Sequence, residues 1–430
     1  MSEGKIVVCI DIGTSKIVTL IAKVDEQVNV LGVSETLANG IKKGQIVDID
    51  EAVVSINNSL EAAERMAGYS ASHVVASIGG SHIESQNSRG VVAVARPEGE
   101  ITESDLTRVF DAAKAVSLPS SREIIHVLPR SYIVDGQEGI KDPIGMTGVR
   151  LEVDTHIITA NAVSIKNMGK AFSDVGVDLD AVVFSGYASS LATLSETEKE
   201  LGVVLVDIGA GTTDISIYVD GSVAYSSVLP IGARHITNDL AIGLRISLES
   251  AEKIKLFLSN PVKKPVRIGE TGEEKLEEHT GDEIDLTDLN LTEELKKVSK
   301  KTLVDGIIRP RLNEIFTMVG IEIKKSGFVG QTPSGIVITG GGARTVGVTE
   351  AAKRMLTMPV RVAIPANIKG IIDEIQEPSF STVIGLAVYA GTLDVQASLP
   401  FGFSLPHLPG ISLNNKMLSK VIGFIKSFLP

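Results

Sequence analysis

The chain has 430 residues, of which 43% are hydrophobic and 22% are charged, the proportions of a soluble folded protein. This length exceeds one compact core, so we expect two or more domains. The formal net charge of −12 argues against nucleic acid as a partner, and attraction to an anionic membrane would need a local basic segment. The only cysteine, Cys9, has no partner for an internal disulfide, and the opening MSEGKIVVCID lacks a signal-peptide pattern.

A glycine-bearing hairpin is predicted at residues 6–22, where an apolar strand ends in Asp11 and a second apolar strand follows a short turn. The turn consists of Gly13, Thr14, Ser15 and Lys16. Glycine lets backbone amides approach a bound anion, and a carboxylate at the mouth can hold Mg²⁺ through water. The hairpin is therefore a candidate phosphate grip, with an ordinary glycine-rich turn as the alternative. A helix is predicted next, at residues 48–68, capped by Asp48 or Asp50.

Residues 84–163 do not belong to any repeat and predict a small inserted α+β domain. They contain strand-like stretches on either side of a capped helix that begins at Thr102. His126 and His156 lie in apolar strand-like stretches, so we interpret them as core histidines and not as catalytic residues.

A second hairpin is predicted at residues 203–221, with Asp207 placed 196 positions after Asp11. Its turn region contributes Gly209, Gly211, Thr212 and Thr213. A recurrence at this spacing indicates an internal duplication. Two similar α/β halves that each present such a hairpin imply a cleft, with nucleotide phosphates between the hairpins and Mg²⁺ near both aspartates.

Downstream, residues 246–258 predict a helix that carries Glu252 and Lys255 on one face. The pair could contact a nucleotide sugar, but the spacing by itself favours a surface ion pair. A further helix is expected from about Thr292 to Val319, kinked or broken at Pro310.

A third glycine-rich loop follows the apolar strand that begins at residue 335. It consists of Gly340, Gly341 and Gly342. The later stretch 381–391 predicts a helix whose small residues suit close packing beneath the cleft.

The end of the chain predicts a membrane-surface helix at residues 414–430, after a linker at 397–413. At 100° per residue its apolar side chains share one arc, and the basic ones lie opposite. The apolar arc consists of Met417, Leu418, Val421, Ile422, Phe424, Ile425, Phe428 and Leu429, and the lysines are Lys416, Lys420 and Lys426. The segment is too short to span a bilayer. A helix docked on the protein's own core is the alternative.

Three motifs in this order, DIGTSK (11–16), DIGAGTTD (207–214) and ITGGGA (338–343), resemble the actin/Hsp70/sugar-kinase ATPase superfamily. Within it the whole chain is similar to the FtsA family of bacterial cell-division proteins, through stretches such as GIKKGQIVDID (40–50) and FSGYASS (184–190). The resemblance implies an actin-like α/β fold: two duplicated α/β halves around a nucleotide cleft, an inserted small α+β domain and a C-terminal amphipathic helix.

The resemblance also implies a division into subdomains. Subdomain 1A would comprise 1–83, 164–197 and about 376–395; subdomain 1C, 84–163; subdomain 2A, 198–240 and 320–375; subdomain 2B, 241–319; then a linker at 396–413 and the membrane-targeting helix at 414–430.

ATP and Mg²⁺ are the ligands that the family implies, with Asp11 and Asp207 coordinating Mg²⁺ through water. The two turns would hold the phosphates, Glu252 and Lys255 the ribose, and the glycine triplet would lie beside the adenine. Where related ATPases carry a catalytic glutamate, this chain has Ser185-Gly186-Tyr187. We therefore expect no catalytic residue at that place and weak or no hydrolysis.

The family implies a scaffold that polymerises on the cytoplasmic face of the inner membrane at the division site. It would anchor FtsZ filaments there and recruit later division proteins through subdomain 1C. Arg311 and Glu314 match positions implicated in binding the FtsZ C-terminal tail, although a structural salt bridge explains Arg311 nearly as well. A PilM-like pilus-assembly ATPase is the alternative, and a sugar kinase is a further one that lacks a recognisable catalytic acid.

Overall fold

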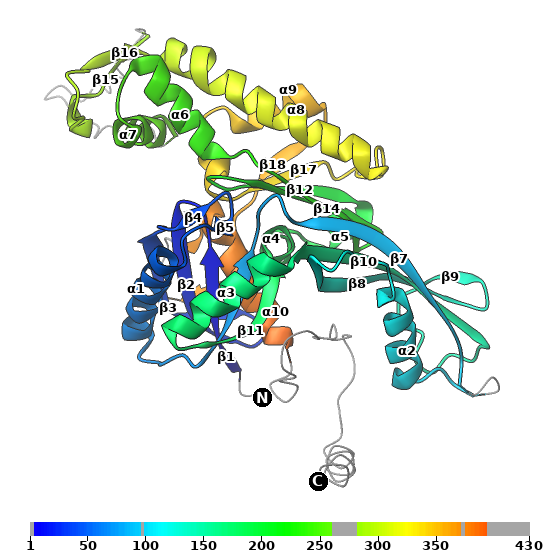
Figure 1. The fold of residues 1–430 in the computed structure, drawn as a ribbon. Helices are drawn as coiled ribbons and strands as arrows, with labels where there is room; N and C mark the ends of the chain where they lie inside the picture. The colour runs from blue at the N-terminus through cyan, green and yellow to red at the C-terminus, as the bar shows by residue number, and fades with distance from the viewer. Residues whose placement is uncertain (1–3, 96–98, 260–281, 371–374, 394–430) are drawn as a thin grey trace, which may run out of the picture.

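The computed structural model describes residues 4–95, 99–259, 282–370 and 375–393, so the predicted linker and C-terminal helix lie outside the described residues. Two α/β halves stack on one another, with a smaller domain beside them (Figure 1). The sheet of the first half has six strands in the order β11-β6-β1-β2-β3-β19. Its strands are β1 (Lys5–Ile12), β2 (Lys16–Val24), β3 (Val28–Leu37), β6 (His73–Ile78), β11 (Asp178–Phe184) and β19 (Ile368–Gly370).

The sheet of the second half repeats this topology, which confirms the predicted duplication. Its strands are β12 (Val203–Ile208), β13 (Thr213–Val219), β14 (Ser222–Leu229), β17 (Ile336–Thr339) and β18 (Val360–Val362). Their order, β14-β13-β12-β17-β18, matches β3-β2-β1-β6-β11 strand for strand. Each half begins with an antiparallel hairpin, and a parallel strand pairs with the hairpin's first strand.

Alternating apolar side chains of β1 divide the core of the first half into two layers. Val8 and Ile10 pack toward α1 (Ile49–Ala67) and α3 (Ala162–Val175). Val7 and Cys9 pack toward α4 (Ser185–Thr193) and α10 (Ser381–Thr392) on the opposite face. Of the two caps considered for α1, Asp48 is the one used, because its carboxylate accepts the Glu51 backbone N–H at 3.1 Å.

Helices α4 and α10 lie between the two sheets and cross at very short range. A Cβ placed on Gly385 would lie 1.7 Å from the carbonyl oxygen of Ala188, so only glycine fits. The prediction of close packing by small residues at 381–391 is therefore confirmed. Helix α5 (Glu196–Leu201) then leads into β12.

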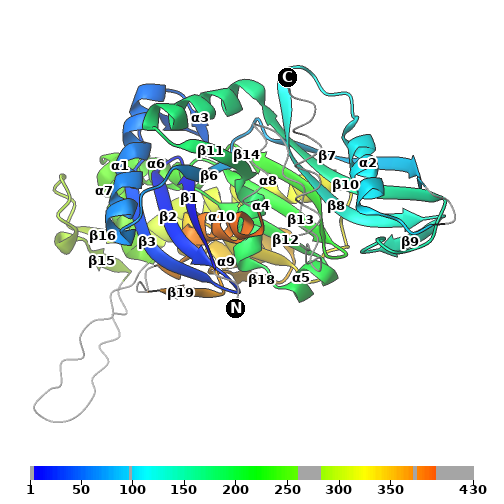
Figure 2. The same cartoon turned by 90° about the horizontal axis from the view of Figure 1, so that it is seen from below.

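The inserted domain is a four-stranded sheet in the order β7-β10-β8-β9, covered by one helix. Its elements are β7 (Glu84–Ala93), α2 (Glu103–Lys114), β8 (Arg122–Val134), β9 (Gln137–Ile140) and β10 (Arg150–Asn161). Val109 and Phe110 of α2 pack on Leu151, which gives the domain its own core. Figure 2 shows the domain projecting to the side opposite α1. The predicted cap is present, because Asp105 accepts hydrogen bonds from the backbone N–H and hydroxyl of Thr102.

The second half carries the remaining helices on the outer face of its sheet. They are α6 (Ala233–Leu244), α7 (Leu248–Ser259), α8 (Arg309–Ser326) and α9 (Val348–Leu356). The short strands are β15 (Glu283–Asp285) and β16 (Lys297–Ser299) here, with β4 (Ile41–Lys42) and β5 (Gln45–Ile46) in the first half.

The prediction of a helix from about Thr292 to Val319 was wrong in both bounds. Residues 297–299 form β16, a π-helical turn spans Thr302–Ile308, and α8 continues to Ser326. Pro310 does not break this path. It lies in the first turn of α8, directly after the π-helical turn, where the spacing of the backbone hydrogen bonds changes. In the described part of the chain, no helix is long and apolar enough to cross a membrane.

Candidate nucleotide site between the two hairpins

The turns of the two hairpins have the same geometry and touch one another. The Gly13 N–H donates to the Lys16 carbonyl at 3.1 Å, and the Gly209 N–H donates to the Thr212 carbonyl at 2.9 Å. A Cβ on Gly211 would lie 2.7 Å from Thr14 Oγ1, so glycine at 211 lets the second turn approach the first. The structure thus brings together the two turns that the sequence identified separately.

The glycine triplet lies against the second hairpin. Gly340 has φ +81°, and a Cβ there would lie 2.1 Å from Asp207 Oδ1. A Cβ on Gly342 would lie 2.4 Å from Ile208 Cγ2, whereas one on Gly341 would meet only Ser379 Cβ at 3.9 Å. Gly340 and Gly342 therefore allow the loop to pack closely against β12. Gly341 is exposed, so its backbone is accessible to a ligand.

Asp207 is held at the centre of this arrangement and is only 5% exposed. Its Oδ2 accepts hydrogen bonds from Ser189 of α4 and, at 3.2 Å, from Thr382 of α10. Burial raises the pKa of Asp207 to about 6, and the nearby charge of Asp11 acts in the same direction. Two hydroxyl donors oppose this rise and fix the carboxylate in one orientation.

Asp11 occupies the matching place in the first hairpin. Its Oδ1 accepts a hydrogen bond from the Ser77 hydroxyl at 2.7 Å, and Ser77 Oγ in turn accepts the Ile12 backbone N–H at 2.9 Å. Burial raises the pKa of this carboxyl as well. The register pairs Asp11 with Val18 in one hairpin and Asp207 with Asp214 in the other.

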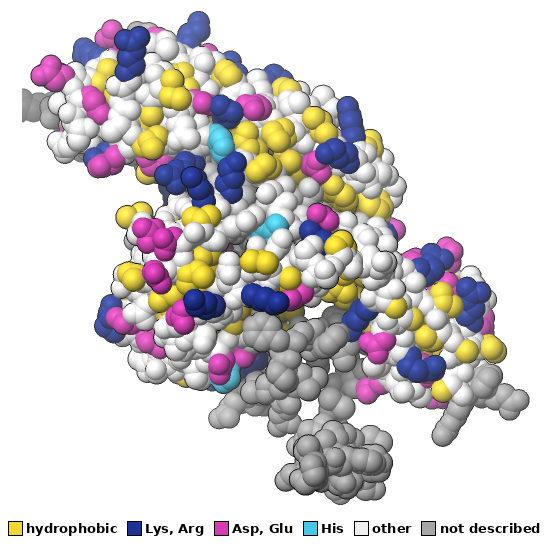
Figure 3. All heavy atoms as spheres, viewed as in Figure 1, with side chains coloured by type: hydrophobic (Ala, Val, Ile, Leu, Met, Phe, Trp, Pro, Cys, Tyr) yellow, Lys and Arg dark blue, Asp and Glu magenta, His cyan; other side chains and the backbone are white. Residues whose placement is uncertain are grey.

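The chemistry of these groups fits Mg²⁺ and a polyphosphate. Hard oxygen donors at two facing turns suit Mg²⁺, which keeps several waters and takes few direct protein ligands. Among the described residues, no group of three or more His, Cys, Asp or Glu side chains is placed to hold a metal ion. The surface is hollowed between the two halves, where Lys and Arg side chains gather (Figure 3).

Three of the predicted phosphate contacts have other partners in this structure. Lys16 Nζ lies 2.5 Å from Glu35 Oε2 and 4.6 Å from the centre of the Phe380 ring. The Thr213 hydroxyl is buried and donates to the Ile231 carbonyl at 2.8 Å. The Thr14 hydroxyl accepts the Gly44 N–H at 3.0 Å, while Ser15 is exposed. Their roles at phosphate stay predictions.

Glu252 and Lys255 form an ion pair of 2.7 Å on α7, bridged to α6 by Thr237. The Thr237 hydroxyl donates to Glu252 at 2.6 Å, and Lys255 Nζ donates to Thr237 Oγ1 at 2.9 Å. The pair thus ties two helices together, and its contact with a ribose stays a prediction.

The segment Ser185-Gly186-Tyr187 has no room for a longer side chain at its centre. A Cβ on Gly186 would lie 2.8 Å from the Phe184 ring and 3.1 Å from Ser216 Oγ. The Ser185 hydroxyl donates to the Ile78 carbonyl at 3.1 Å, and Tyr187 packs edge-on against His126. No carboxylate stands in this segment.

Both histidines of the inserted domain are buried and neutral, which confirms their interpretation as core residues. Burial lowers the pKa of each to about 3. His126 Nε2 accepts the Phe184 N–H at 3.0 Å. His156 lies 2.7 Å from Asn87 Oδ1 and 3.1 Å from Ser226 Oγ of β14.

Sequence reasoning did not identify the side chains that hold the two aspartates. Ser77, Ser189 and Thr382 come from three separate segments, and only Ser189 lies in a stretch that carries the family resemblance, FSGYASS (184–190). The small-residue stretches that contain Ser189 and Thr382 were the available signal. Asp214 closes the motif DIGAGTTD (207–214), and the pattern by itself predicts no role for it.

Arg311 and Glu314 lie on α8, away from the hairpins. Arg311 forms two parallel bonds to Asp239 of α6, at 2.6 and 2.8 Å, and a third at 2.5 Å to Glu314. These neighbours raise the pKa of Arg311. The structural salt bridge considered from the sequence is therefore present, and an incoming acidic group would have to compete with it.

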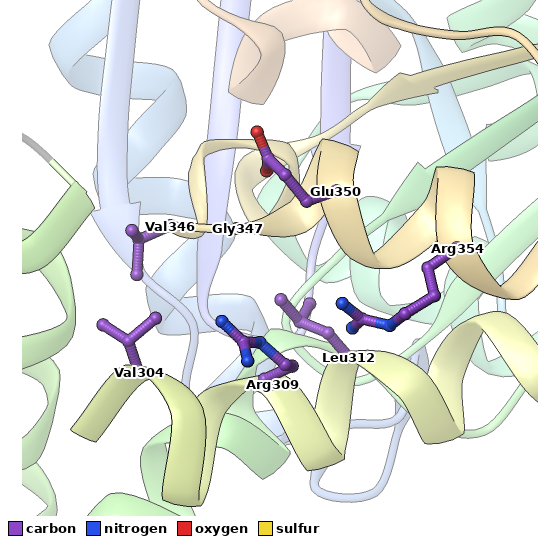
Figure 4. A pocket seen from close by; sticks show the side chains of 7 residues that line it. All are labelled: Val304, Arg309, Leu312, Val346, Gly347, Glu350 and Arg354. Atoms are coloured by element: carbon purple, nitrogen blue, oxygen red, sulfur yellow. The ribbon is translucent and has the colours of Figure 1, made fainter. Parts of the chain in front are cut away.

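A cavity of about 280 Å³ opens on the other side of α8, against α9 (Figure 4). Its lining consists of Val304, Arg309, Leu312, Val346, Gly347, Glu350 and Arg354. Arg311 and the glycine triplet are not among these residues, so this cavity is distinct from the surfaces predicted from the sequence.

Two family models match the chain, one described as "SHS2 domain inserted in FTSA" over residues 80–159 and one described as "Cell division protein FtsA" over residues 204–385. The cell-division protein FtsA of Pseudomonas aeruginosa is 37% identical over 391 residues and that of Borreliella burgdorferi 39% identical over 388. The alignments cover 90% and 89% of this chain and 90% of each relative. FtsA of Escherichia coli K12 is 34% identical, with 90% and 91% covered.

Solved structures with the same fold are far more distant in sequence. A chain of the PilM-PilN type IV pilus biogenesis complex gives a TM-score of 0.62 at 14% identity, with 90% of this chain and 98% of that chain covered. MreB5 of Spiroplasma citri bound to ADP gives 0.51 at 13%, with 90% and 95% covered. At such identities the likeness establishes the actin-like fold and no more.

Proposed function

The chain belongs to the FtsA family of cell-division proteins, and from that premise we propose that it is an ATP-binding scaffold that links FtsZ filaments to the cytoplasmic face of the membrane at the division site. It polymerises there and recruits later division proteins through its inserted domain. ATP sets the arrangement of the two halves, and hydrolysis is slow.

The observation that carries ATP binding is the convergence of three glycine-bearing loops around two carboxylates, the buried Asp207 and the half-buried Asp11. The hairpin turns touch at Thr14 and Gly211, and Gly340 brings the third loop against Asp207. When bound, Mg²⁺ would neutralise charge on the phosphates, and Asp11 and Asp207 would hold it through water. A solved structure of the same fold, MreB5 of Spiroplasma citri, is described as bound to ADP, which supports the proposal that this chain binds a nucleotide.

The residues around the proposed phosphate position favour binding of a nucleotide and not its rapid hydrolysis. Ser189 and Thr382 fix Asp207 from two helices that join the halves, so a change at the phosphates would reach both halves. The segment 185–187 offers no carboxylate to a water molecule. This combination supports a clamp that responds to nucleotide, with weak ATPase activity.

The membrane contact rests on residues 414–430, which lie outside the described residues. Their apolar arc and the lysines opposite it support a helix that lies in the lipid interface. The lysines also provide the local basic segment that an otherwise acidic chain needs near anionic lipid.

The contact with the FtsZ tail rests on Arg311 and Glu314 of α8. Arg311 is partly exposed, but Asp239 and Glu314 already neutralise it. An acidic tail would therefore bind by exchanging one carboxylate partner of Arg311 for another, which predicts modest affinity and marked salt dependence.

The test is sedimentation of the full chain with vesicles containing anionic lipid, with and without Mg²⁺ and ATP, and with FtsZ tail peptide added. We expect the full chain to pellet with the vesicles and to carry the peptide with it. A chain lacking residues 414–430 should stay in the supernatant, and vesicles of neutral lipid provide the matched control. Pelleting of the truncated chain would refute the membrane assignment.

A second arm separates this function from PilM-like pilus assembly. The peptide in the pellet is either the FtsZ tail or a cytoplasmic peptide of a pilus membrane protein. Retention of the pilus peptide alone would favour the alternative. Loss of FtsZ peptide with Arg311→Glu, but not with Arg309→Glu two positions away, would support the predicted contact.

A further inference from the structure

The β4–β5 hairpin has no part in the function proposed above, yet it touches the first phosphate turn. Figure 1 shows β4 and β5 at the end of the first half that faces the second half. The Gly44 N–H donates a hydrogen bond of 3.0 Å to Thr14 Oγ1. Thr14 is 9% exposed, and a Cβ on Gly211 would lie 2.7 Å from the same oxygen. The Thr14 side chain thus lies between the β4–β5 hairpin and the second turn.

The direction of this hydrogen bond decides what the Thr14 hydroxyl can still do. A hydroxyl has one hydrogen and two lone pairs, so an oxygen that accepts from a backbone N–H keeps its own hydrogen to donate. Among the described residues, Thr14 Oγ1 has no acceptor for that hydrogen. The bond from Gly44 also restricts rotation of the side chain. The hydroxyl is therefore oriented by the protein and left with a donor for a ligand.

The turn of the hairpin has a strained geometry. Lys42 pairs with Gln45, so the turn consists of Lys43 and Gly44, with φ of 50° and 74°. Positive φ at both positions is the geometry of a type I′ turn, and a lysine adopts it only at a cost in free energy. Strain that is retained beside a ligand site indicates that the position of this turn matters there.

The loop after β6 supports the hairpin from the other side. A Cβ on Gly44 would lie 2.9 Å from the backbone nitrogen of Gly80. The side-chain amide of Gln45 lies 2.9 Å from His82 Nδ1 and fastens the hairpin to the same loop. The Gly44 amide is therefore held against Thr14 by contacts on both sides of the hairpin.

The second phosphate turn lacks this arrangement. Position 210 matches Thr14 when Asp11 is aligned with Asp207, and it is an alanine without a hydroxyl. The Ala210 carbonyl oxygen instead accepts the Arg234 N–H of α6 at 2.9 Å. The oriented hydroxyl therefore belongs to the first turn and is not a general product of the duplication.

We propose that Gly44 is a positioning residue of the nucleotide site: its backbone N–H holds the Thr14 hydroxyl so that this hydroxyl donates a hydrogen bond to a phosphate oxygen of ATP. The inference rests on the ATP binding proposed above and adds the β4–β5 hairpin to the groups that determine affinity. A hydrogen bond to a charged oxygen is stronger than one between neutral groups. Because Gly44 acts only through the hydroxyl, its effect on affinity must vanish when the hydroxyl is removed.

The test is a double-mutant cycle in the full chain. Thr14→Val keeps the shape of the side chain against Gly211 and removes the hydroxyl. Gly44→Ala places a methyl against the loop after β6 and moves the hairpin away from Thr14. The Kd of a fluorescent ATP analogue with Mg²⁺ is measured for the wild type, the two single variants and the double variant.

We expect each single variant to raise the Kd on the order of tenfold, and the double variant to stay within about threefold of Thr14→Val. Independent effects would instead multiply to about a hundredfold. In a Thr14→Ser background, which keeps the hydroxyl, Gly44→Ala should again raise the Kd on the order of tenfold. This dependence on the hydroxyl is what a merely structural role of Gly44 would not produce.

Gly136→Ala is the matched control for strain in the turn. Asp135 and Gly136 form the two-residue turn between β8 and β9, with φ of 48° and 87°. Among the described residues, no atom beyond its chain neighbours lies within 4 Å of a Cβ on Gly136, so its ATP Kd should match the wild type. If Gly44→Ala folds poorly, Gly80→Ala serves as a second variant, because its Cβ would lie 3.0 Å from the Lys43 carbonyl oxygen and displace the hairpin.

Hydrogen–deuterium exchange of residues 40–50 without nucleotide reports the contact itself. Thr14→Val removes the acceptor of the Gly44 N–H, so this amide should exchange faster. Gly136→Ala should leave its exchange unchanged.

The outcomes separate this inference from the proposed function. If the wild type does not bind ATP, the proposed function fails and the inference falls with it. If the wild type binds ATP but Thr14→Val binds it as tightly, or if the effects of Thr14→Val and Gly44→Ala multiply, only the inference fails. Unchanged exchange of the Gly44 N–H in Thr14→Val, or an equal loss of affinity in Gly136→Ala, would also overturn it.

Discussion

At the scale of single residues, the candidate site depends on where backbone comes within contact distance of Asp207. Gly340 and Gly342 approach β12 so closely that no side chain fits, whereas Gly341 between them is open. The motif GGG predicts a close approach but does not say which glycine makes it. The contact distances assign the outer two to packing and leave the middle one open.

Gly340→Ala should destabilise the protein by about 2–4 kcal/mol, because the new methyl would overlap Asp207 Oδ1 at a backbone φ of +81°. ATP affinity should fall as well, since the carboxylate would have to move. Thermal unfolding and titration with a fluorescent ATP analogue measure the two effects. Gly341→Ala is the control and should leave Tm nearly unchanged. Equal losses in the two variants would contradict the assignment.

The buried His126 predicts a pH dependence of stability. Its pKa is about 3 in the folded chain, against 6.5 for a free histidine, so the unfolded chain binds the proton more readily. The contribution of His126 is thus fully present above pH 6.5 and is lost as the pH falls below that value. Between pH 7 and pH 5 the loss should be on the order of 2 kcal/mol.

Chemical unfolding at pH 7 and pH 5 measures this loss. His126→Gln keeps a side chain that can accept the Phe184 N–H but cannot titrate, so its stability should change less with pH. Other groups affect both proteins alike and cancel in the comparison. Identical pH slopes for the two proteins would show that His126 is not the group responsible.

At the scale of elements, the crossing of α4 and α10 connects the site to both halves. Ser189 and Thr382 reach Asp207 from these two helices, and Gly385 lets their backbones touch at Ala188. Small residues indicated close packing from the sequence. They did not indicate which helix would be the partner, because Ser189 of α4 and Ser381 of α10 lie 192 positions apart in the sequence.

Gly385→Ala should destabilise the protein by about 3 kcal/mol, because its methyl would lie 1.7 Å from the Ala188 carbonyl oxygen. Separation of the helices should also move Thr382 away from Asp207 and weaken ATP binding. Gly306→Ala is the matched control: among the described residues, no atom beyond its own stretch of helix lies within 4 Å of the new methyl, and the helical position should gain about 0.5–1 kcal/mol. Thermal unfolding of both variants, with and without ATP, measures the change in stability and the change in ATP binding.

At the scale of the whole molecule, the inserted domain docks on the second half although the chain enters and leaves it from the first. The Ser85 hydroxyl donates to the Ser226 carbonyl of β14 at 2.7 Å, and Asn87 donates to the Ala224 carbonyl at 3.1 Å. The domain therefore touches both halves.

Replacement of Ser85 and Asn87 by alanine should loosen this docking without unfolding the domain. The Ser226 N–H, which donates to Ser85 Oγ at 3.1 Å, should then exchange with deuterium faster, by tenfold for each 1.4 kcal/mol lost. Hydrogen–deuterium exchange of the β14 peptide measures this. Ser88→Ala removes a bond of 2.9 Å to Ala113 inside the inserted domain and should leave β14 exchange unchanged. Unchanged exchange in the double variant would argue against the docking role.

The sequence by itself determined the local elements and the duplication, because these depend on short-range patterns. Apolar strands that end in Asp11 and Asp207, the turns after them and the glycine triplet were all identifiable from residue order, and they placed the fold class and family correctly. It misplaced the helix around Pro310, because helical periodicity does not register a π-helical turn or a three-residue strand.

Only the tertiary structure decided how distant side chains meet. Ser77, Ser189 and Thr382 hold the aspartates from segments far apart in the chain, and Arg311 is neutralised by Asp239 of another helix. Asp214 is buried, and its Oδ1 has no hydrogen-bond partner among the described residues. These facts depend on distances across the fold, which residue type and spacing do not encode. Burial then sets the charge of each group, so the chemistry of the site follows from packing.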